Sequence, residues 1–220
     1  MTKKSVEPAG AQQSKPSAAG RLPTQQRSRD RVERILEIAT GLIEAGGCDA
    51  LRMSEIAAGA EISIGSLYQY FPDKSAVIRR LAERFNAAGR ACVAAELAQV
   101  QLAGDIKAAL KRVIDGYYAM FLAEPVMRDI WSGTQNDKAL LALEAEDNRA
   151  HGKMLAETLL RLHPAADRKE IDISSFLLMH LIAATVRLAI TLPDQDARNL
   201  IATFKQTMLE TFRLPARSKS

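Results

Sequence analysis

A stretch of twenty-one residues, from 54 to 74, constrains the fold of this chain more than any other part of it. Apolar residues recur there at helical intervals, first at Ile56 and Ala60 and then at Leu67 and Phe71. Residues 57–59 have almost no side-chain bulk, which two helices that cross steeply require at their contact. The pattern predicts two short helices that cross at a tight turn.

Capping residues mark the ends of the second short helix. Ser63 is suited to the N-cap, where its hydroxyl accepts a hydrogen bond from an amide of the first turn. Pro72 stops the helix, and Asp73 caps the next one, so that Lys74 lies in its first turn. Gly65 has no side chain and lets another molecule approach the backbone closely. This arrangement is typical of a helix-turn-helix, whose second helix lies in the major groove of DNA.

Residues 29 to 85, about a quarter of the chain, resemble the DNA-binding domain of the tetracycline-repressor (TetR-type) family of bacterial transcription regulators. The resemblance is carried by residues 34–39, 46–47 and 54–57, and most specifically by the run of residues 62–74. It implies an all-α fold, in which an N-terminal three-helix domain with a helix-turn-helix precedes a C-terminal helical domain for ligand binding and dimerisation.

Two positions depart from the family pattern. Glu61 stands where the turn usually has glycine, so we expect it to adopt a less favourable backbone conformation or a slightly different turn. Arg52 stands where the first short helix usually has Ser or Thr, which removes a cap and adds a cation near the DNA backbone.

Ten residues are predicted to lie at the DNA interface, where tyrosine and serine hydroxyls commonly bind phosphate oxygens. They are Arg52, Ser54, Ser63, Ile64, Gly65, Ser66, Tyr68, Gln69, Tyr70 and Lys74. An alternative is that residues 67–71 form the core stripe of an ordinary helix, since tyrosines often pack in cores with one end in water. That alternative does not explain a glycine and a serine in the first turn.

Charge is concentrated at the N-terminus. The chain of 220 residues has a formal net charge of +4, yet residues 1–31 alone carry +5, which leaves the rest near −1. A positive end beside a helix-turn-helix suits a phosphate partner. For residues 1–20, a tail that only aids solubility is an equally good explanation.

The remaining composition argues against several classes of protein. Cys48 and Cys92 lack metal-ligand or CxxC spacing, so we expect reduced thiols, with redox sensing as the alternative. We find no nucleophile–base pair, phosphate-binding glycine loop or metal cluster, and we therefore predict no enzyme activity, metal or cofactor. No apolar leader precedes the domain, and the apolar segment 173–186 is too short to span a membrane. We expect a cytoplasmic protein, nucleoid-associated when bound to DNA.

The chain is predicted to divide into five segments. These are a disordered basic extension (1–26), the helix-turn-helix domain (27–73), a connecting helix (74–100), a helical ligand-binding and dimerisation domain (101–214) and a basic tail (215–220). The first helix is expected to begin at Ser28 and to end at Gly46 and Gly47. Residues 176–190 are apolar nearly all round, which predicts burial on two sides by its own domain and by a second copy of the chain. The central helix of a monomeric bundle is the alternative.

The resemblance implies a small-molecule pocket in the C-terminal domain. Aromatic and thioether side chains there suit an apolar or amphipathic ligand. The candidates are Tyr117, Met120, Phe121, Met127, Trp131, Met154 and His180. Ordinary core packing is the alternative for each of them.

The sequence thus predicts a homodimeric regulator that binds a double-stranded DNA operator and that a ligand releases. Alternatives are a regulator that activates and an architectural DNA-binding protein without a ligand.

Overall fold

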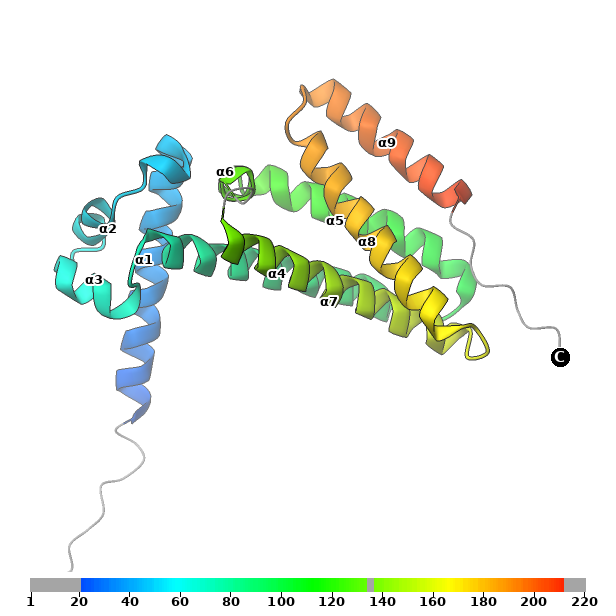
Figure 1. The fold of residues 1–220 in the computed structure, drawn as a ribbon, viewed down its shortest axis with the longest axis horizontal. Coiled ribbons are helices and arrows are strands. Elements are labelled where there is room, and N and C mark those ends of the chain that lie inside the picture. The colour runs from blue at the N-terminus through cyan, green and yellow to red at the C-terminus, as the bar shows by residue number, and fades with distance from the viewer. Residues whose placement is uncertain (1–20, 134–136, 212–220) are drawn as a thin grey trace, which may run out of the picture.

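The computed structural model describes residues 21–133 and 137–211, and this part of the chain is helical without strands (Figure 1). The all-α prediction is confirmed. The elements in chain order are α1 (Arg21–Ala50), α2 (Met53–Gly59), α3 (Ile64–Tyr70), α4 (Lys74–Ala98), the 3₁₀ turn η2 (Ala103–Asp105), α5 (Ile106–Ala123), α6 (Val126–Gly133), α7 (Lys138–Leu162), α8 (Arg168–Ala189) and α9 (Asp194–Thr211).

Helix α1 starts seven residues earlier than the sequence predicted. It begins at Arg21 rather than at Ser28, so the predicted disorder is wrong for residues 21–26, whereas residues 1–20 lie outside the described part. Residues 25–31 are exposed, and the Gln26 side chain donates a local hydrogen bond of 2.7 Å to Asp30. At the other end, Gly47 leaves helical geometry with φ 76°, which confirms that glycine interrupts the helix there.

Helices α1, α2 and α3 form a compact unit at one end of the molecule (Figure 1). Ile35, Ile56 and Leu67, one from each helix, are fully buried and form its core. Gly59 allows α2 to approach α1, because a Cβ there would lie 2.7 Å from Cγ2 of Ile38. The small residues predicted at a steep helix crossing thus serve the contact with α1.

Helix α4 leaves this unit and runs along the second one, where it packs against α5 and α7 (Figure 1). The Asp73 side chain accepts a hydrogen bond of 2.7 Å from the Ala76 amide and caps the start of α4. The helix ends at Ala98, close to the predicted end at residue 100. One continuous helix therefore belongs to both units.

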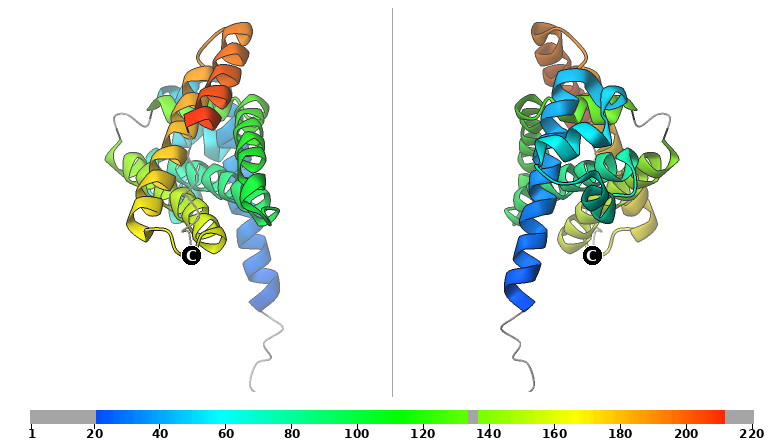
Figure 2. Two further views of the ribbon diagram at one scale, coloured as in Figure 1. Left: turned by 90° about the vertical axis from the view of Figure 1, so that its right-hand side faces the viewer. Right: turned by 90° about the vertical axis from the view of Figure 1, so that its left-hand side faces the viewer.

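The second unit is a layered bundle of α4, α5, α7, α8 and α9, with α6 placed between it and α1. End-on views show the α1–α3 unit at one end and α8 with α9 towards the other (Figure 2). Helices α7 and α8 make the most extensive contact. Gly152 permits it, because a Cβ there would lie 2.8 Å from the Cα of Phe176.

Helix α8 has two apolar faces. One is buried in the bundle, and the other exposes Ile173, Leu177, Leu181 and Leu188 by 43% or more. The helix is 22 residues long, longer than the apolar segment in the sequence, and by length and composition alone it could span a membrane. Its packing against α5, α7 and α9 is instead that of a helix in a bundle.

Candidate functional site

The turn between α2 and α3 is a Schellman motif, a helix end closed by two backbone hydrogen bonds. The Ile62 amide donates to the Ala57 carbonyl at 3.0 Å, and the Glu61 amide donates to the Ala58 carbonyl at 3.1 Å. This motif requires a left-handed residue, and Glu61 provides it with φ 57°. The expected unfavourable backbone at Glu61 is therefore confirmed.

Helix α3 is capped and oriented by the residues that the sequence singled out. The Ser63 hydroxyl accepts a hydrogen bond of 3.1 Å from the Ser66 amide, as an N-cap does. Leu67 and Phe71 point into the core, with 0% and 6% exposure. The opposite face of α3 therefore points away from the protein, with Ile64 and Tyr68 among the exposed large apolar side chains.

The predicted DNA-interface residues fall into an exposed and a half-buried group. The exposed ones are Arg52, Ser54, Ser63, Ile64, Gly65, Tyr68 and Gln69, and the half-buried ones are Ser66, Tyr70 and Lys74. A Cβ on Gly65 would meet nothing within 4 Å, so its backbone is open to a partner. Arg52 makes no capping bond and lies 3.9 Å from the Glu55 carboxylate.

Lys74 is held within the protein. Its Nζ donates to the backbone carbonyls of Asp49 at 3.2 Å and Cys48 at 3.5 Å, at the end of α1. This side chain ties the start of α4 to the end of α1. Sequence spacing did not reveal this contact, because its two partners are twenty-five and twenty-six residues away along the chain.

The two cysteines are free thiols, as predicted. Burial, and then the nearby carboxylates of Asp129 and Asp49, raises the pKa of Cys48 to about 11. Burial also raises the pKa of Cys92. Thiolate is the reactive form of cysteine, so these shifts argue against redox sensing by either residue.

The predicted ligand residues lie at several places. Phe121, Met127 and Trp131 are buried, whereas Tyr117, Met120, Met154 and His180 are half-buried. His180 stacks on Phe176 of its own helix, with ring centroids 6.3 Å apart. Trp131 lies on α6, the helix that contacts α1, and residues 134–136 beside it lie outside the described part.

Three side chains converge over Gly89 of α4. A Cβ at this glycine would lie 3.4 Å from Cε2 of Tyr117, 3.7 Å from Cε of Met120 and 3.9 Å from Cε1 of His151. The Tyr117 ring also packs edge-on against Phe121, with ring centroids 5.2 Å apart. Three predicted ligand residues therefore gather here, together with a histidine that the sequence did not single out.

A buried polar network adjoins this point. The Asp147 carboxylate accepts a hydrogen bond from Arg90 and lies 3.3 Å from Nδ1 of His151. Burial raises the pKa of Asp147 and lowers that of His151. The spacing of four between Asp147 and His151 is the one signal in the sequence that could have revealed the pair.

Several buried polar atoms in the second unit lack a partner among the described residues. They include Nδ2 of Asn86, Nε1 of Trp131, Nε2 of His151 and Oγ of Ser175. An unpartnered buried donor or acceptor costs about 1–3 kcal/mol. Such groups in a protein core require a specific explanation.

A cavity of about 380 Å³ lies where the two units meet. It is lined by Glu37 and Thr40 of α1, by Leu81, Arg84, Phe85 and Ala88 of α4, and by Met120 and Glu124 of α5. Its apolar wall includes Met120, the residue that also contacts the point above Gly89. Met120 thus contacts both the cavity and the space beside Gly89 that His151 of the polar network also contacts.

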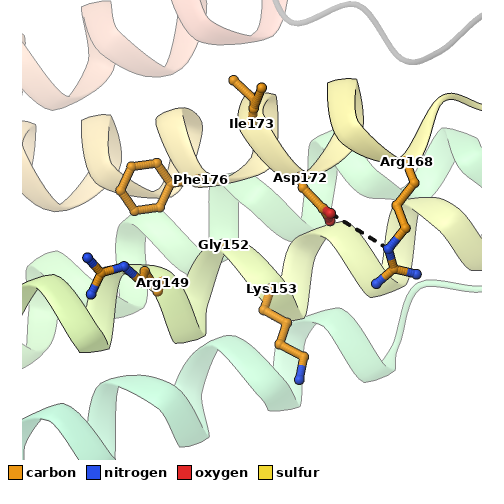
Figure 3. Close-up of a pocket in the computed structure, with 7 residues that line it drawn as sticks. All are labelled: Arg149, Gly152, Lys153, Arg168, Asp172, Ile173 and Phe176. Atoms are coloured by element: carbon orange, nitrogen blue, oxygen red, sulfur yellow. Dashed lines mark ion pairs between the residues drawn. The ribbon is translucent and has the colours of Figure 1, made fainter.

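A more open pocket of about 490 Å³ lies between α7 and α8 (Figure 3). It is lined by Arg149, Gly152 and Lys153 of α7 and by Arg168, Asp172, Ile173 and Phe176 of α8.

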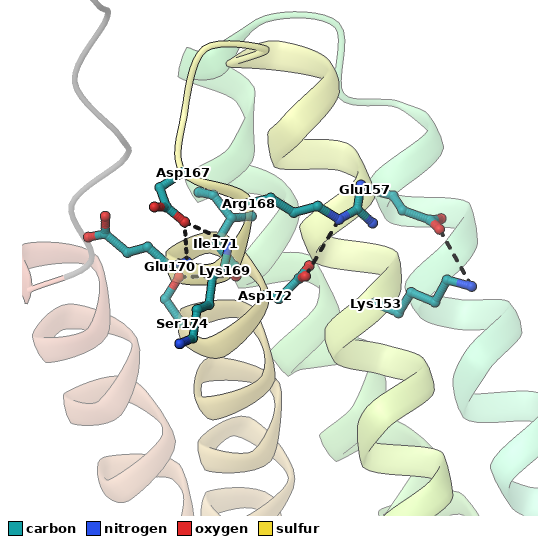
Figure 4. Close-up of polar contacts among 9 residues, drawn as sticks. All are labelled: Lys153, Glu157, Asp167, Arg168, Lys169, Glu170, Ile171, Asp172 and Ser174. Atoms are coloured by element: carbon teal, nitrogen blue, oxygen red, sulfur yellow. Dashed lines mark hydrogen bonds and ion pairs between the residues drawn. The ribbon is translucent and has the colours of Figure 1, made fainter.

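The polar groups beside this pocket are engaged locally (Figure 4). Arg168 lies 3.6 Å from Asp172, and Lys153 lies 3.8 Å from Glu157, each pair one turn apart on its own helix. Asp167 caps α8 by accepting hydrogen bonds from the Lys169 and Glu170 amides. Each of these exposed ion pairs lies within a single helix and contributes little to stability. They therefore do not indicate a ligand-binding site in this pocket.

Two family models match the chain. Residues 35–81 match the model described as bacterial regulatory proteins of the tetR family, and residues 104–214 match the tetracyclin repressor-like C-terminal domain. The second match alone covers half of the chain.

A curated relative is the HTH-type transcriptional repressor KstR from Rhodococcus jostii, 36% identical over 67 residues. The match covers 28% of this chain and 31% of that protein. The KstR of Mycolicibacterium smegmatis is 39% identical over 46 residues, which cover 21% of this chain and 22% of that protein. The chain therefore spans less than a third of the length of these relatives.

Solved structures share the fold over most of the chain. A TetR-family transcriptional regulator from Streptomyces coelicolor has a TM-score of 0.60 and 22% identity, and the match covers 82% of this chain and 96% of that one. The regulator FadR from Bacillus subtilis, solved in complex with stearoyl-CoA, has a TM-score of 0.60 and 17% identity, with 81% and 95% covered.

Proposed function

We propose, from the premise that this chain belongs to the TetR family of bacterial transcription regulators, that it represses transcription from a DNA operator until a small molecule releases it. The exposed face of α3 is the observation that carries this proposal. Ser63, Gly65 and Tyr68 present a hydroxyl, an open backbone and a phenol on one capped helix whose other face is anchored in the core. Such a helix fits a major groove and its phosphate walls.

The interface residues that we propose are the exposed members of the predicted set, with Ser66 and Tyr70 at the edge of α3. Lys74 contributes by fixing α4 to the end of α1. DNA binding would place the protein at the nucleoid in the cytoplasm.

We propose that the protein acts as a homodimer through the exposed face of α8. Ile173, Leu177, Leu181 and Leu188 form an apolar stripe, and a pocket of about 340 Å³ beside it is lined by Leu178, Phe204 and Met208 among others. A second copy would cover this surface and would supply a second α3 for a two-fold symmetric operator. The enzymatic alternative has little support, because the matching family models and the curated relatives are transcription regulators.

Selection of duplexes from random DNA tests the proposal. We expect a partly palindromic site whose half-sites are a helical turn, or a multiple of it, apart. Tyr68→Phe should weaken binding to the selected site by about fivefold to tenfold, because one phosphate contact is lost. Fluorescence anisotropy measures this change, and Tyr118→Phe on α5 is the matched control.

Equal affinity for selected and random duplexes would instead favour an architectural DNA-binding protein. Unchanged affinity in Tyr68→Phe would move the interface away from this face of α3.

A further inference from the structure

We propose that the cavity between α1, α4 and α5 binds an uncharged molecule with an apolar body and a hydroxyl group, and that Asn86 and His151 hydrogen-bond that hydroxyl. This inference rests on the proposed function and specifies the chemistry of its ligand. The apolar body would lie against Leu81, Phe85 and Met120, which line the cavity of about 380 Å³. The hydroxyl would lie beside Gly89.

The two unpartnered polar atoms determine the chemistry of the ligand group. The carboxylate of Asp147 only accepts hydrogen bonds, so Nδ1 of His151, 3.3 Å away, carries the proton. Burial keeps the ring neutral by lowering its pKa, and Nε2 is then an acceptor. The Gly89 backbone raises the pKa of the ring to a smaller extent than burial lowers it. Nε2 of His151 itself lacks a hydrogen-bond partner among the described residues.

Asn86 provides the complementary donor. Its side chain is 4% exposed, and its Nδ2 lacks a partner among the described residues. Asn86 precedes Gly89 by three residues on α4, so both lie on one face of that helix. A hydroxyl is the simplest group that accepts from an amide and donates to an imidazole at the same time.

The path from cavity to network runs past Met120. The Cε of Met120 and the Cε1 of His151 each lie within 4 Å of the same point above Gly89. Met120 also lines the cavity, and an unbranched thioether side chain changes rotamer readily. Movement of this one side chain would let a hydroxyl on a cavity-bound molecule reach His151.

Charge at the cavity disfavours an anionic ligand. Glu37 and Glu124 are exposed at its rim, and Arg84 lies 3.3 Å from the Glu33 carboxylate. In the network, Arg90 is likewise paired with Asp147. Neither cation is left to neutralise a carboxylate on the ligand, so an uncharged hydroxyl fits best.

The test uses the full chain without DNA and three probes that share one ten-carbon chain, namely decanol, its methyl ether and decanoate. Binding is followed by the fluorescence of Trp131, the only tryptophan in the chain, and by the melting temperature. We expect decanol to bind at least about tenfold more tightly than either analogue, because only it satisfies both polar atoms. Equal binding of all three, tighter binding of decanoate, or binding of none overturns the proposal.

Gly89→Ala is the decisive variant. The added Cβ would make ordinary van der Waals contacts with Tyr117 and Met120, so the protein should fold with an unchanged or higher melting temperature. It would fill the position of the hydroxyl and should abolish the preference for decanol. Gly41→Ala on the exposed side of α1 is the matched control, since nothing lies within 4 Å of its Cβ, and it should keep that preference.

Asn86→Leu provides an independent variant. Removal of an unpartnered buried donor should raise the melting temperature and weaken decanol binding about tenfold or more. A wild-type preference for decanol in Gly89→Ala or in Asn86→Leu would show that the hydroxyl does not bind here.

The outcomes separate this inference from the proposed function. Operator release by some other compound, with no binding of decanol, would leave the repressor function intact and refute this ligand chemistry. Selective binding of decanol with no change in operator affinity would support this ligand chemistry and contradict only the ligand-responsive part of the proposed function.

Discussion

Glu61 shows how a single residue can depart from the pattern of its fold and still form the required turn. The Schellman bonds of α2 need a left-handed residue after the helix, and glycine is the usual choice because it has no Cβ. Glu61 adopts φ 57° nevertheless, and its carboxylate lies 3.7 Å from Arg34. That ion pair is exposed on both sides and contributes little.

Glu61→Gly should therefore stabilise the protein. Relief of the left-handed conformation, worth about 1–2 kcal/mol, outweighs the entropy that glycine loses on folding, about 0.5–1 kcal/mol. We expect the free energy of unfolding to rise by about 0.5 kcal/mol in urea titrations. Glu55→Gly, inside α2, is the control and should lower it by about 1 kcal/mol. A loss of stability in Glu61→Gly would mean that the ion pair with Arg34 matters more than the backbone.

The residues that cap and anchor α3 were predictable from sequence because their roles are local. Ser63 caps α3 through a hydrogen bond from an amide three residues further along the chain, and Leu67 and Phe71 follow the helical period. Lys74 and the network around His151 were not predictable in the same way. Their partners come from α1 and α4, and only the tertiary fold brings those helices together.

At the scale of elements, α8 combines a core face with a face that its own protomer leaves uncovered. The sequence predicted two covered sides from a run that is apolar nearly all round, but periodicity could not assign each residue to a side. Ala183 is 7% exposed and belongs to the protomer core, whereas Leu181 is 43% exposed. The start of α1 was also missed, because residues 25–31 near it are polar and exposed, without the apolar period that would mark a helix.

Leu181→Glu tests the exposed face of α8. The side chain is exposed in the protomer, so the charge should leave the helical fold intact, yet it would be buried without a partner in a dimer. We expect monomers by light scattering at concentrations where the wild type is dimeric, with unchanged circular dichroism. The matched control is Leu122→Glu, a 53% exposed leucine on α5. A Leu181→Glu protein that remains dimeric would place the interface elsewhere.

For the whole molecule, the cavity between α1, α4 and α5 lies where the DNA-binding unit meets the bundle. A ligand there can shift the operator equilibrium only by its preference for one arrangement of the two units. Because binding of ligand and of operator is thermodynamically linked, each changes the affinity for the other by the same factor. We therefore expect that a small molecule which weakens operator binding by a given factor is itself bound more weakly by that factor when operator DNA is present.

Two titrations check this equality, one of operator with and without the small molecule and one of the small molecule with and without operator. Binding of a molecule that never alters operator affinity would refute the ligand-responsive part of the proposed function and leave its DNA-binding part unaffected.

The continuity of α4 has a mechanical consequence. Its 25 residues make a rod about 37 Å long. A tilt of about 5° at the bundle end would sweep the other end through about 3 Å, and two-fold symmetry would change the span between the two α3 helices by about 6 Å. The major groove of DNA repeats about every 34 Å along the double helix. In the proposed dimer, a change of this size in the distance between the two α3 helices would move them out of register with successive grooves. A small tilt of this one helix would thus be enough to change the spacing of the two α3 helices in the proposed dimer.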